Sequence, residues 1–382
     1  MSGIYIHIPF CRKKCHYCNF FSLASLQYKE RFLDAVKEEI FLRKDYLGET
    51  LVDSIYLGGG TPSVLNISET EGLLNEIRKY YPLGENPEIT LEANPDDLNP
   101  ALLGEYLKAG INRLSIGIQS FYDDDLGYLN RIHSGKRAEE SVVQAKEAGF
   151  SNISIDLIYG IPTLTPGKWE NNLDKAYSLE VPHISTYSLT VEPKTALDLL
   201  IRKNKLPGPV EEQVLEHFRI LLRKMEEQQF EHYEISNFCK NGFYSRHNSM
   251  YWKGIPYLGL GPSAHSFNGS SRQWNISNLV HYIDLVSRDE LFFESEELTP
   301  VQKYNEYVMV SLRTMWGCDI RKIRNDFGAG MATWFTVHVA SHVSAGNVIE
   351  KEGVFLLTDE GKLFADGIAS DLFFESQKSS EW

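Results

Sequence analysis

The chain has 382 residues, of which 42% are apolar and 24% charged. This is enough apolar material for one large domain and a smaller one. Acidic residues outnumber basic ones by 52 to 38, which gives a formal net charge of −14. Because a nucleic-acid-binding surface normally carries excess positive charge, we expect no nucleic-acid partner.

The N-terminal segment and the hydropathy indicate a cytoplasmic protein. The chain begins MSGIYIHIPFC, without the basic, apolar and small-residue regions of a secretion signal. It has no run of about 18 uninterrupted apolar residues, which a membrane-spanning helix needs. Composition leaves peripheral contact with the inner face of a membrane open.

Short β-rich runs alternate with helix-period runs over residues 1–228. Strands are expected at 4–8, 54–57, 88–93, 113–118, 153–158 and 184–189. Helices are expected near 28–44, 68–80, 100–109, 136–148, 168–179 and 210–228. This alternation predicts an α/β fold with a parallel sheet and right-handed crossovers. The spacing favours a partial (β/α)6 barrel, although periodicity alone does not separate it from a doubly wound sheet.

Polar or glycine-rich residues follow nearly every predicted strand. In chain order they are PFCRKKCHYC, GGGTPS, Glu92 with Asn94, GIQSF, and Asp156. In a barrel of this kind the active site lies at the C-terminal ends of the strands. We therefore expect a ligand site at that end.

The rest of the chain is expected to form two further parts. Residues 229–298 are a less regular connecting region, rich in aromatic, Gly, Asn and Ser residues. Residues 299–382 return to helical patterns and end with GVFLLTDEGKLFADGIASDLFF. That ending is typical of a strand, a turn and a helix, as in a small winged-helix-like α+β domain.

Three of the five cysteines fall within eight residues, at Cys11, Cys15 and Cys18. Without an export signal, an odd number of cysteines argues against disulfides. Three thiolates on one loop can hold a [4Fe–4S] cluster and leave its fourth iron without a protein ligand. A structural zinc ion would want a fourth donor, and His16 is badly placed beside Cys15. Three unpaired thiols are the simplest alternative.

The C-x3-C-x2-C spacing, with the aromatic Tyr17 before the third cysteine, resembles the signature of the radical S-adenosylmethionine superfamily. In that superfamily the open iron binds the amino and carboxylate groups of S-adenosylmethionine. Reduction of the cluster then cleaves the sulfonium to a 5′-deoxyadenosyl radical. The resemblance implies two cofactors, the cluster and S-adenosylmethionine, and an electron donor as a partner.

The GGGTP motif at 58–62 follows a predicted strand, where glycines let backbone amides approach a ligand. Alone it would indicate an ordinary tight turn. Beside the cysteines it resembles the superfamily's GGE-type motif, which implies that Gly59, Gly60 and Thr61 hold the cofactor. Other residues match, in order and spacing, the cofactor contacts of the coproporphyrinogen-oxidase-like subgroup. They are Glu92, Gln119, Arg131 and Asp156, with Tyr5 and Tyr17 beside the cysteines.

The whole chain resembles the oxygen-independent coproporphyrinogen III oxidase and its relative, the HemW heme chaperone. The shared segments are YIHIPFC, GGGTPS, GIQSF, DLIYGIP and LLTDEGKLFADGI. The oxidase has a fourth cysteine two positions after the third, whereas this chain continues Cys18-Asn19-Phe20 without one. It also has a long N-terminal extension, whereas only ten residues precede Cys11 here. Both departures argue against porphyrinogen decarboxylation.

The segment His247-Asn248-Ser249-Met250-Tyr251-Trp252 resembles the HNxxYW motif associated with heme in the chaperone family. A neutral imidazole is a good axial ligand for heme iron, so His247 is the candidate ligand. Tyr251 and Trp252 could form a flat apolar wall. The alternative is that His247 caps a turn while both aromatics pack in the core.

The sequence therefore predicts a heme chaperone on a radical S-adenosylmethionine scaffold, delivering heme to respiratory membrane proteins. The second hypothesis is oxidative decarboxylation of coproporphyrinogen III to protoporphyrinogen IX, and a third is radical chemistry on another tetrapyrrole-like substrate. Cys239 could be a second heme ligand or a redox-sensitive thiol, but burial is the simpler expectation, as it is for Cys318. For His265 we expect a structural hydrogen bond.

Overall fold

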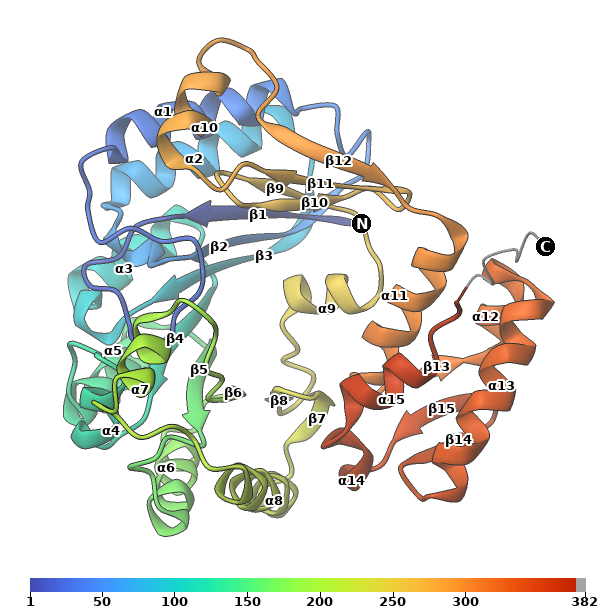
Figure 1. Cartoon of the computed structure of the whole chain (residues 1–382). Coiled ribbons are helices and arrows are strands. Elements are labelled where there is room, and N and C mark those ends of the chain that lie inside the picture. The colour runs from blue at the N-terminus through green and yellow to red at the C-terminus, as the bar shows by residue number, and fades with distance from the viewer. Residues whose placement is uncertain (376–382) are drawn as a thin grey trace.

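A computed structural model of the chain describes residues 1–375 (Figure 1). The first six strands form a parallel sheet in which neighbours in the chain are neighbours in the sheet. They are β1 (Ser2–Ile8), β2 (Val52–Gly59), β3 (Leu83–Ala93), β4 (Arg113–Gln119), β5 (Asn152–Tyr159) and β6 (His183–Ser188). The predicted α/β class with a parallel sheet at its centre is confirmed.

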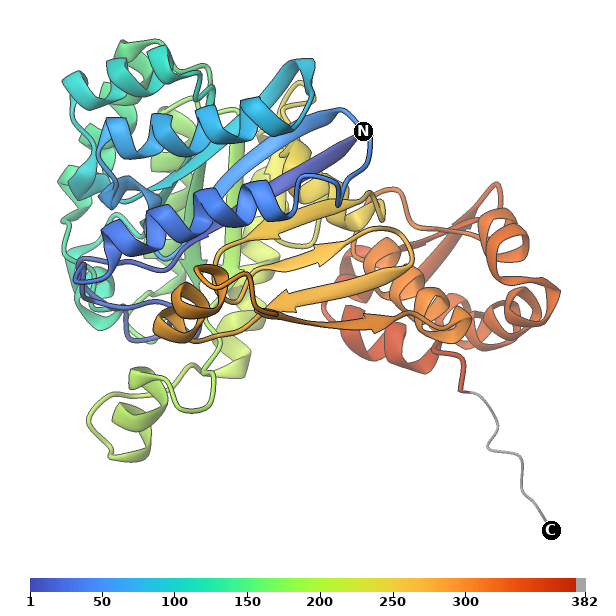
Figure 2. The ribbon, with the colours of Figure 1, turned by 90° about the horizontal axis from the view of Figure 1, so that it is seen from above.

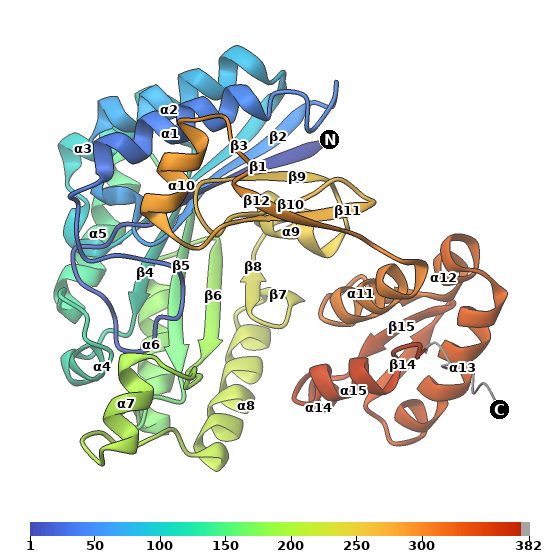
Figure 3. The ribbon, with the colours of Figure 1, turned by 45° about the horizontal axis from the view of Figure 1, so that its top comes forward.

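The helices that follow these strands cover the outer face of the curved sheet (Figures 1 and 3). The predicted ones are α1 (Lys29–Leu42), α2 (Ile67–Tyr80), α3 (Pro100–Ala109), α5 (Gly135–Ala148), α6 (Pro166–Ser178) and α8 (Glu211–Glu227). Local signals mark their ends: Asn66 and Glu69 form a capping box on α2, and Gly110 closes α3 in a left-handed conformation. Two helices that the periodicity does not predict are α4 (Asp123–Tyr128) and α7 (Ala196–Arg202).

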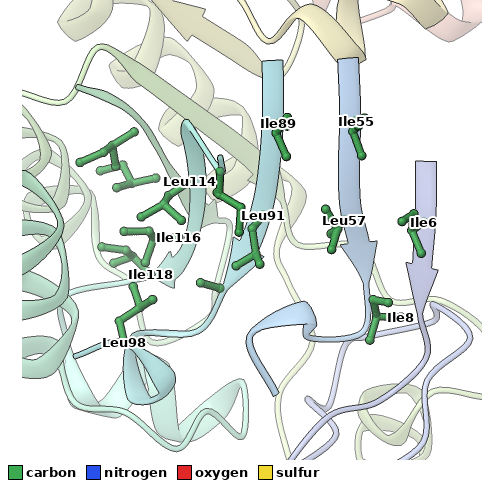
Figure 4. Packing of buried hydrophobic residues seen from close by; sticks show 14 of the residues in the cluster. Ile6, Ile8, Ile55, Leu57, Ile89, Leu91, Leu98, Leu114, Ile116 and Ile118 are labelled. Atoms are coloured by element: carbon green, nitrogen blue, oxygen red, sulfur yellow. The ribbon is translucent and has the colours of Figure 1, made fainter. Parts of the chain in front are cut away.

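The strands alternate between two environments, and this alternation positions the site. In β3, Ile89 and Leu91 pack into the main hydrophobic core beneath the helices (Figure 4). Because side chains on a strand alternate in direction, Glu92, the residue after Leu91, faces the inside of the sheet. In β4, Leu114 and Ile116 likewise pack in the core. The concave face is therefore free to carry polar groups.

Residues 231–297 add strands to both ends of this sheet, where the sequence predicts a less regular region. At one end are β8 (Asn237–Cys239) and β7 (Glu231–Glu234), and at the other β9 (Tyr257–Leu260), β10 (His265–Phe267), β11 (Ser271–Asn275) and β12 (Phe293–Glu297). The described strands run in the order β12-β11-β10-β9-β1-β2-β3-β4-β5-β6-β8-β7. Figure 2 shows the added strands, in yellow and orange, beside the blue β1. This region also holds α9 (Arg246–Trp252) and α10 (Leu279–Val286).

A buried carboxylate ties the added strands to the first helix. Glu39 of α1 accepts hydrogen bonds from the Gly261 amide, at 2.7 Å, and from the side chains of Asn275 and Tyr282. The partners lie more than 200 residues away in the chain. Such a contact leaves no local signal in the sequence. The strands added by residues 231–297 are therefore not predicted from it.

The last part of the described chain has its own hydrophobic core. Its helices are α11 (Pro300–Leu312), α12 (Ile320–Phe327), α13 (Ala329–Ser344), α14 (Asp359–Lys362) and α15 (Ala365–Asp371). Its antiparallel sheet has the order β13-β15-β14, from β13 (Cys318–Asp319), β14 (Val348–Lys351) and β15 (Val354–Leu357). We keep 1–228, 229–298 and 299–382 as a proposed division of the chain, whose last residues, 376–382, lie outside the described ones. Within residues 1–375, no helix combines the length and apolar character needed to cross a bilayer.

Candidate functional site

A cavity of about 390 Å³ lies at the C-terminal ends of the parallel strands. Its volume is in the range of small-molecule sites. Most of the residues predicted to bind the cluster or S-adenosylmethionine line it together. They are Cys11, Cys15, Cys18, Tyr17, Gly59, Gly60, Thr61, Glu92, Gln119, Arg131 and Asp156.

The loop that carries the cysteines is held over the strand ends by main-chain hydrogen bonds. The His16 amide donates to the Leu129 carbonyl, and the Leu197 amide of α7 donates to the His16 carbonyl. The His16 ring shares a bond of 3.0 Å with the Tyr128 carbonyl through Nδ1 and does not line the cavity. His16 is thus turned away from the thiols that a zinc site would require.

The three thiols lie along one wall of the cavity, with Cys11 nearly buried and Cys15 and Cys18 half-buried. Within residues 1–375, no three His, Cys, Asp or Glu side chains gather as a site for a single metal ion. A spread set of three thiols fits a cluster in which each iron takes one thiolate. Burial raises the pKa of Cys11 and of Cys18, so cluster binding would release protons.

Two glycines at the end of β2, Gly59 and Gly60, let the strand approach the cysteine loop closely. Gly59 has a φ of +107°, a left-handed conformation that favours glycine. A Cβ on Gly60 would lie 2.7 Å from the Phe10 carbonyl oxygen and 2.8 Å from that of Ile8. Any side chain at Gly60 would displace the backbone that precedes Cys11. The GGGTP turn is therefore shaped to place bare backbone beside the thiols.

Two half-buried carboxylates face the cavity from β3 and β5. Glu92 accepts from the Tyr56 hydroxyl at 2.8 Å and from the Gly59 amide at 3.1 Å. Asp156 accepts from the Ser115 hydroxyl at 3.3 Å. Burial raises the pKa of Glu92 to about 7 and that of Asp156 to about 6. Acceptors of this kind suit the hydroxyl groups of a sugar.

The raised pKa of Glu92 predicts a pH-dependent cost to stability. The folded state holds the Glu92 proton up to about pH 7, against about 4.5 for an ordinary glutamate, so stability falls as pH rises through this window. The Glu92→Gln variant has no carboxyl group to titrate there. As pH rises through this window, we expect its free energy of unfolding to fall by up to about 3 kcal/mol less than that of the unaltered protein, since one pKa unit corresponds to about 1.4 kcal/mol. Urea unfolding of both proteins near pH 5 and near pH 8 measures it. If the difference in the free energy of unfolding between the two proteins is the same at both pH values, the raised pKa of Glu92 is contradicted.

Two further predicted residues come together at the end of β4 and in the loop after α4. Gln119 has a φ of 69°, which is unusual for a residue with a side chain and marks a strained strand end. Arg131 donates to the Gly117 carbonyl at 2.8 Å and to the Asn94 side chain at 2.6 Å through Nη2. Its Nη1 donates to the Cys15 sulfur at 3.3 Å. Arg131 is therefore fixed beside the thiols.

Tyr5 differs from its prediction, because it does not line the cavity. Its hydroxyl shares a hydrogen bond of 3.1 Å with Nδ1 of His7. Its ring lies behind the cavity, where a Cβ on Gly58 would approach both Tyr5 and Glu92 to 3.0 Å. In this structure Tyr5 supports the layer beneath Glu92.

The structure places the HNxxYW segment on α9, against the N-terminal halves of β1 and β2 and away from the cavity. His247 is only 2% exposed. Its Nδ1 shares a hydrogen bond of 2.8 Å with Ser54, and its Nε2 shares one of 2.8 Å with the Tyr251 hydroxyl. Burial lowers the His247 pKa to about 3, so the ring is neutral. Both ring nitrogens are engaged within the fold, as the alternative of a packed motif expected.

Trp252 packs apart from His247, with the Arg313 guanidinium 6.0 Å from its ring centre. Tyr251 stands edge-on to His247 and to Tyr257. The two aromatics therefore do not form one flat wall in this conformation. An open wall for a macrocycle would require α9 to move.

Several cavity residues are absent from the sequence predictions. Ser115, Tyr187, Ser188, Leu189, Thr190 and Glu192 line the cavity as well. The segment 187–192 spans the C-terminal end of the sixth predicted strand, 184–189, so the rule of strand ends could have found it. Ser115 and Gly117 lie on the same face of β4 because they are two positions apart.

The geometry agrees with the comparisons to known proteins. The profile of the Radical SAM superfamily matches residues 5–176, which hold all three clustered cysteines and the first five strands. The structure of coproporphyrinogen III oxidase (HemN) from Escherichia coli superposes with a TM-score of 0.84 over 97% of this chain and 90% of that one. Its sequence is 24% identical, so this likeness shows the fold alone. Fold and site together define a radical S-adenosylmethionine protein, for which a [4Fe–4S] cluster and S-adenosylmethionine are the implied cofactors.

Two curated relatives narrow the assignment. "Heme chaperone HemW" of Bacillus subtilis is 35% identical over 371 residues, covering 96% of this chain and 98% of the relative. The protein of the same name from Haemophilus influenzae is 31% identical and covers 95% of each chain. The chain belongs to the HemW family within the radical S-adenosylmethionine superfamily.

Proposed function

We propose that this protein is a heme chaperone that holds a [4Fe–4S] cluster and S-adenosylmethionine. The observation that carries the proposal is the cavity in which three thiols, a glycine cradle and two half-buried carboxylates meet, in a chain similar to HemW over nearly its full length. Respiratory membrane proteins are the proposed recipients of the heme. A low-potential electron donor is the proposed redox partner.

The site divides into three sets of contacts. Cys11, Cys15 and Cys18 would hold the cluster, which supplies an iron with an open position for S-adenosylmethionine. Bare backbone at the glycine turn would meet the amino group of that cofactor, and Arg131 would meet its carboxylate. Glu92 and Asp156, facing the cavity from β3 and β5, would accept hydrogen bonds from its ribose hydroxyls.

Heme is proposed to bind through His247. The neutral ring has the protonation state that iron ligation requires, but each nitrogen has a partner within the fold. Ligation through Nε2 therefore requires the hydrogen bond between Nε2 and the Tyr251 hydroxyl to break. We propose that α9, a helix of only seven residues, moves as heme enters.

The competing activity is that of the relative with the shared fold, oxidation of coproporphyrinogen III. Asn19 and Phe20, which follow Cys18, line the cavity, and neither supplies the further thiol of the oxidase. In anaerobic assays with coproporphyrinogen III, S-adenosylmethionine and dithionite, we expect no more protoporphyrin fluorescence than the cluster-free protein gives. Under the same conditions the heme-loaded protein should transfer heme to vesicles that hold an apo-cytochrome b. Turnover comparable to an authentic oxidase, without heme transfer, would overturn the proposal.

A further inference from the structure

One asparagine connects the side chains that donate hydrogen bonds to two of the three clustered cysteines. The Thr61 hydroxyl donates to the Cys11 sulfur at 3.4 Å, and Arg131 Nη1 donates to the Cys15 sulfur at 3.3 Å. Asn94 touches both donors. Its Nδ2 donates to the Thr61 oxygen at 3.3 Å, and its Oδ1 accepts from Arg131 Nη2 at 2.6 Å.

Asn94 is itself held in place by its position in the fold. It directly follows β3, and Pro95 restrains the backbone after it. Its amide donates to Ser63 Oγ at 3.2 Å, and Ser63 in turn donates to the buried Asp97 at 2.8 Å. The side-chain amide therefore has little freedom to leave the two donors. Both of its polar ends are used in this bridge.

Hydrogen bonds to cluster sulfurs change the reduction potential. A reduced cluster carries one more negative charge, spread partly over its sulfur ligands. Donors aimed at those sulfurs stabilise the reduced form more than the oxidised form and raise the potential. A guanidinium adds a positive charge to the same effect. Thr61 and Arg131 act on different thiolates, so a residue that orients both acts on the cluster from two sides.

We propose that Asn94 is a positioning residue that sets the reduction potential of the cluster by orienting Thr61 toward Cys11 and Arg131 toward Cys15. The inference rests on the proposed cluster and deepens it. In the reaction concerned, one electron from the reductant converts the oxidised cluster to its singly reduced form, and no bond is broken.

The test is a redox titration of the reconstituted protein, with dithionite as the reductant and the EPR signal of the reduced cluster as the readout. We expect Asn94→Ala to lower the ratio of reduced to oxidised cluster at a fixed solution potential by about tenfold, which is 59 mV for one electron. Asn94→Asp keeps an acceptor for Arg131 but loses the donor to Thr61 and adds a negative charge. It should lower the ratio at least as far.

Asn112→Ala is the matched control. Asn112 is also an asparagine bonded to the β3 segment, through the Ile89 amide at 2.8 Å and the Pro87 carbonyl at 2.9 Å, but it touches no cysteine donor. Its midpoint should equal that of the unaltered protein. Thr61→Val removes one of the two donors directly. Asn94→Ala should therefore lower the ratio of reduced to oxidised cluster by less in the Thr61→Val variant than in the protein that keeps Thr61.

The outcomes separate the inference from the proposed function. Iron and sulfide analysis comes first, and a protein that binds neither contradicts the proposed cluster itself. A full cluster whose midpoint is unchanged in both Asn94 variants overturns the inference alone. Equal shifts in Asn94→Ala and Asn112→Ala would also overturn it, because they would show a general loosening of β3.

Discussion

Serine at Cys11, Cys15 or Cys18 will strip the protein of its iron–sulfur cluster. Each thiolate is expected to hold one iron, and a serine hydroxyl is a much poorer ligand at neutral pH. Losing a residue that only supports a ligand already costs about 10- to 100-fold in metal affinity, so losing the ligand should cost at least as much. Each variant, reconstituted anaerobically, should contain less than about a tenth of the iron and sulfide bound by the unaltered protein.

The chain provides its own controls for this experiment. Cys239 and Cys318 are fully buried cysteines that line no part of the cavity. Cys239→Ser and Cys318→Ser should therefore keep iron and sulfide at the original level, although each buries a hydroxyl and costs some stability. Retention of a full cluster after replacement of any of the three clustered cysteines would refute the assignment.

The sequence predicts the barrel well because its signals are local. All six predicted strands exist, and each lies within about two residues of its predicted ends except β3, which begins at Leu83. Alternating apolar residues and helix caps act over a few positions, so they survive any later arrangement of the chain. The rule that ligand sites lie at strand ends then brings Glu92, Gln119 and Asp156 to one cavity without knowledge of the fold's details.

The remaining features depend on contacts between distant segments. The strands β7–β12 have three to five residues each and join the edges of the sheet. Their positions are set by distant partners such as Glu39 on α1. The position of Tyr5 behind Glu92 depends on how closely β1 and β2 pack at Gly58. Asn94 gains its contacts only when the ends of β2 and β3 and the loop after α4 meet. None of these leaves a pattern within one segment.

The cavity and the HNxxYW segment are joined by a short path of side chains. Tyr56 donates to Glu92 at one end of its ring, and the ring centre lies 5.1 Å from that of His247. A ligand that pulls Glu92 toward the cavity would therefore disturb the packing of His247. This path gives a physical route by which S-adenosylmethionine could influence release of heme. The decisive measurement is therefore whether His247 binds heme.

His247→Ala should lower heme affinity, whereas Tyr251→Phe should increase it. The Tyr251 hydroxyl shares the 2.8 Å bond with Nε2 that iron ligation would have to break. Removing a competing hydrogen bond of about 0.5–1.5 kcal/mol should tighten heme binding by about 2- to 10-fold. Heme titration followed at the Soret band measures both changes, and loss of the axial ligand should also shift the band in His247→Ala.

A second buried histidine makes the experiment a matched one. His183 has the same environment, with Nδ1 sharing a 2.7 Å bond with Ser154 and Nε2 sharing a 2.7 Å bond with the Tyr233 hydroxyl. It lies outside the HNxxYW segment, so His183→Ala and Tyr233→Phe should disturb packing to a similar degree without altering the Soret spectrum. If the His247 pair and the His183 pair behave alike, His247 is a structural histidine and the heme of this protein has another ligand. Opposite signs for His247→Ala and Tyr251→Phe, with no response from the control pair, would show that the hydroxyl and the iron compete for the same nitrogen.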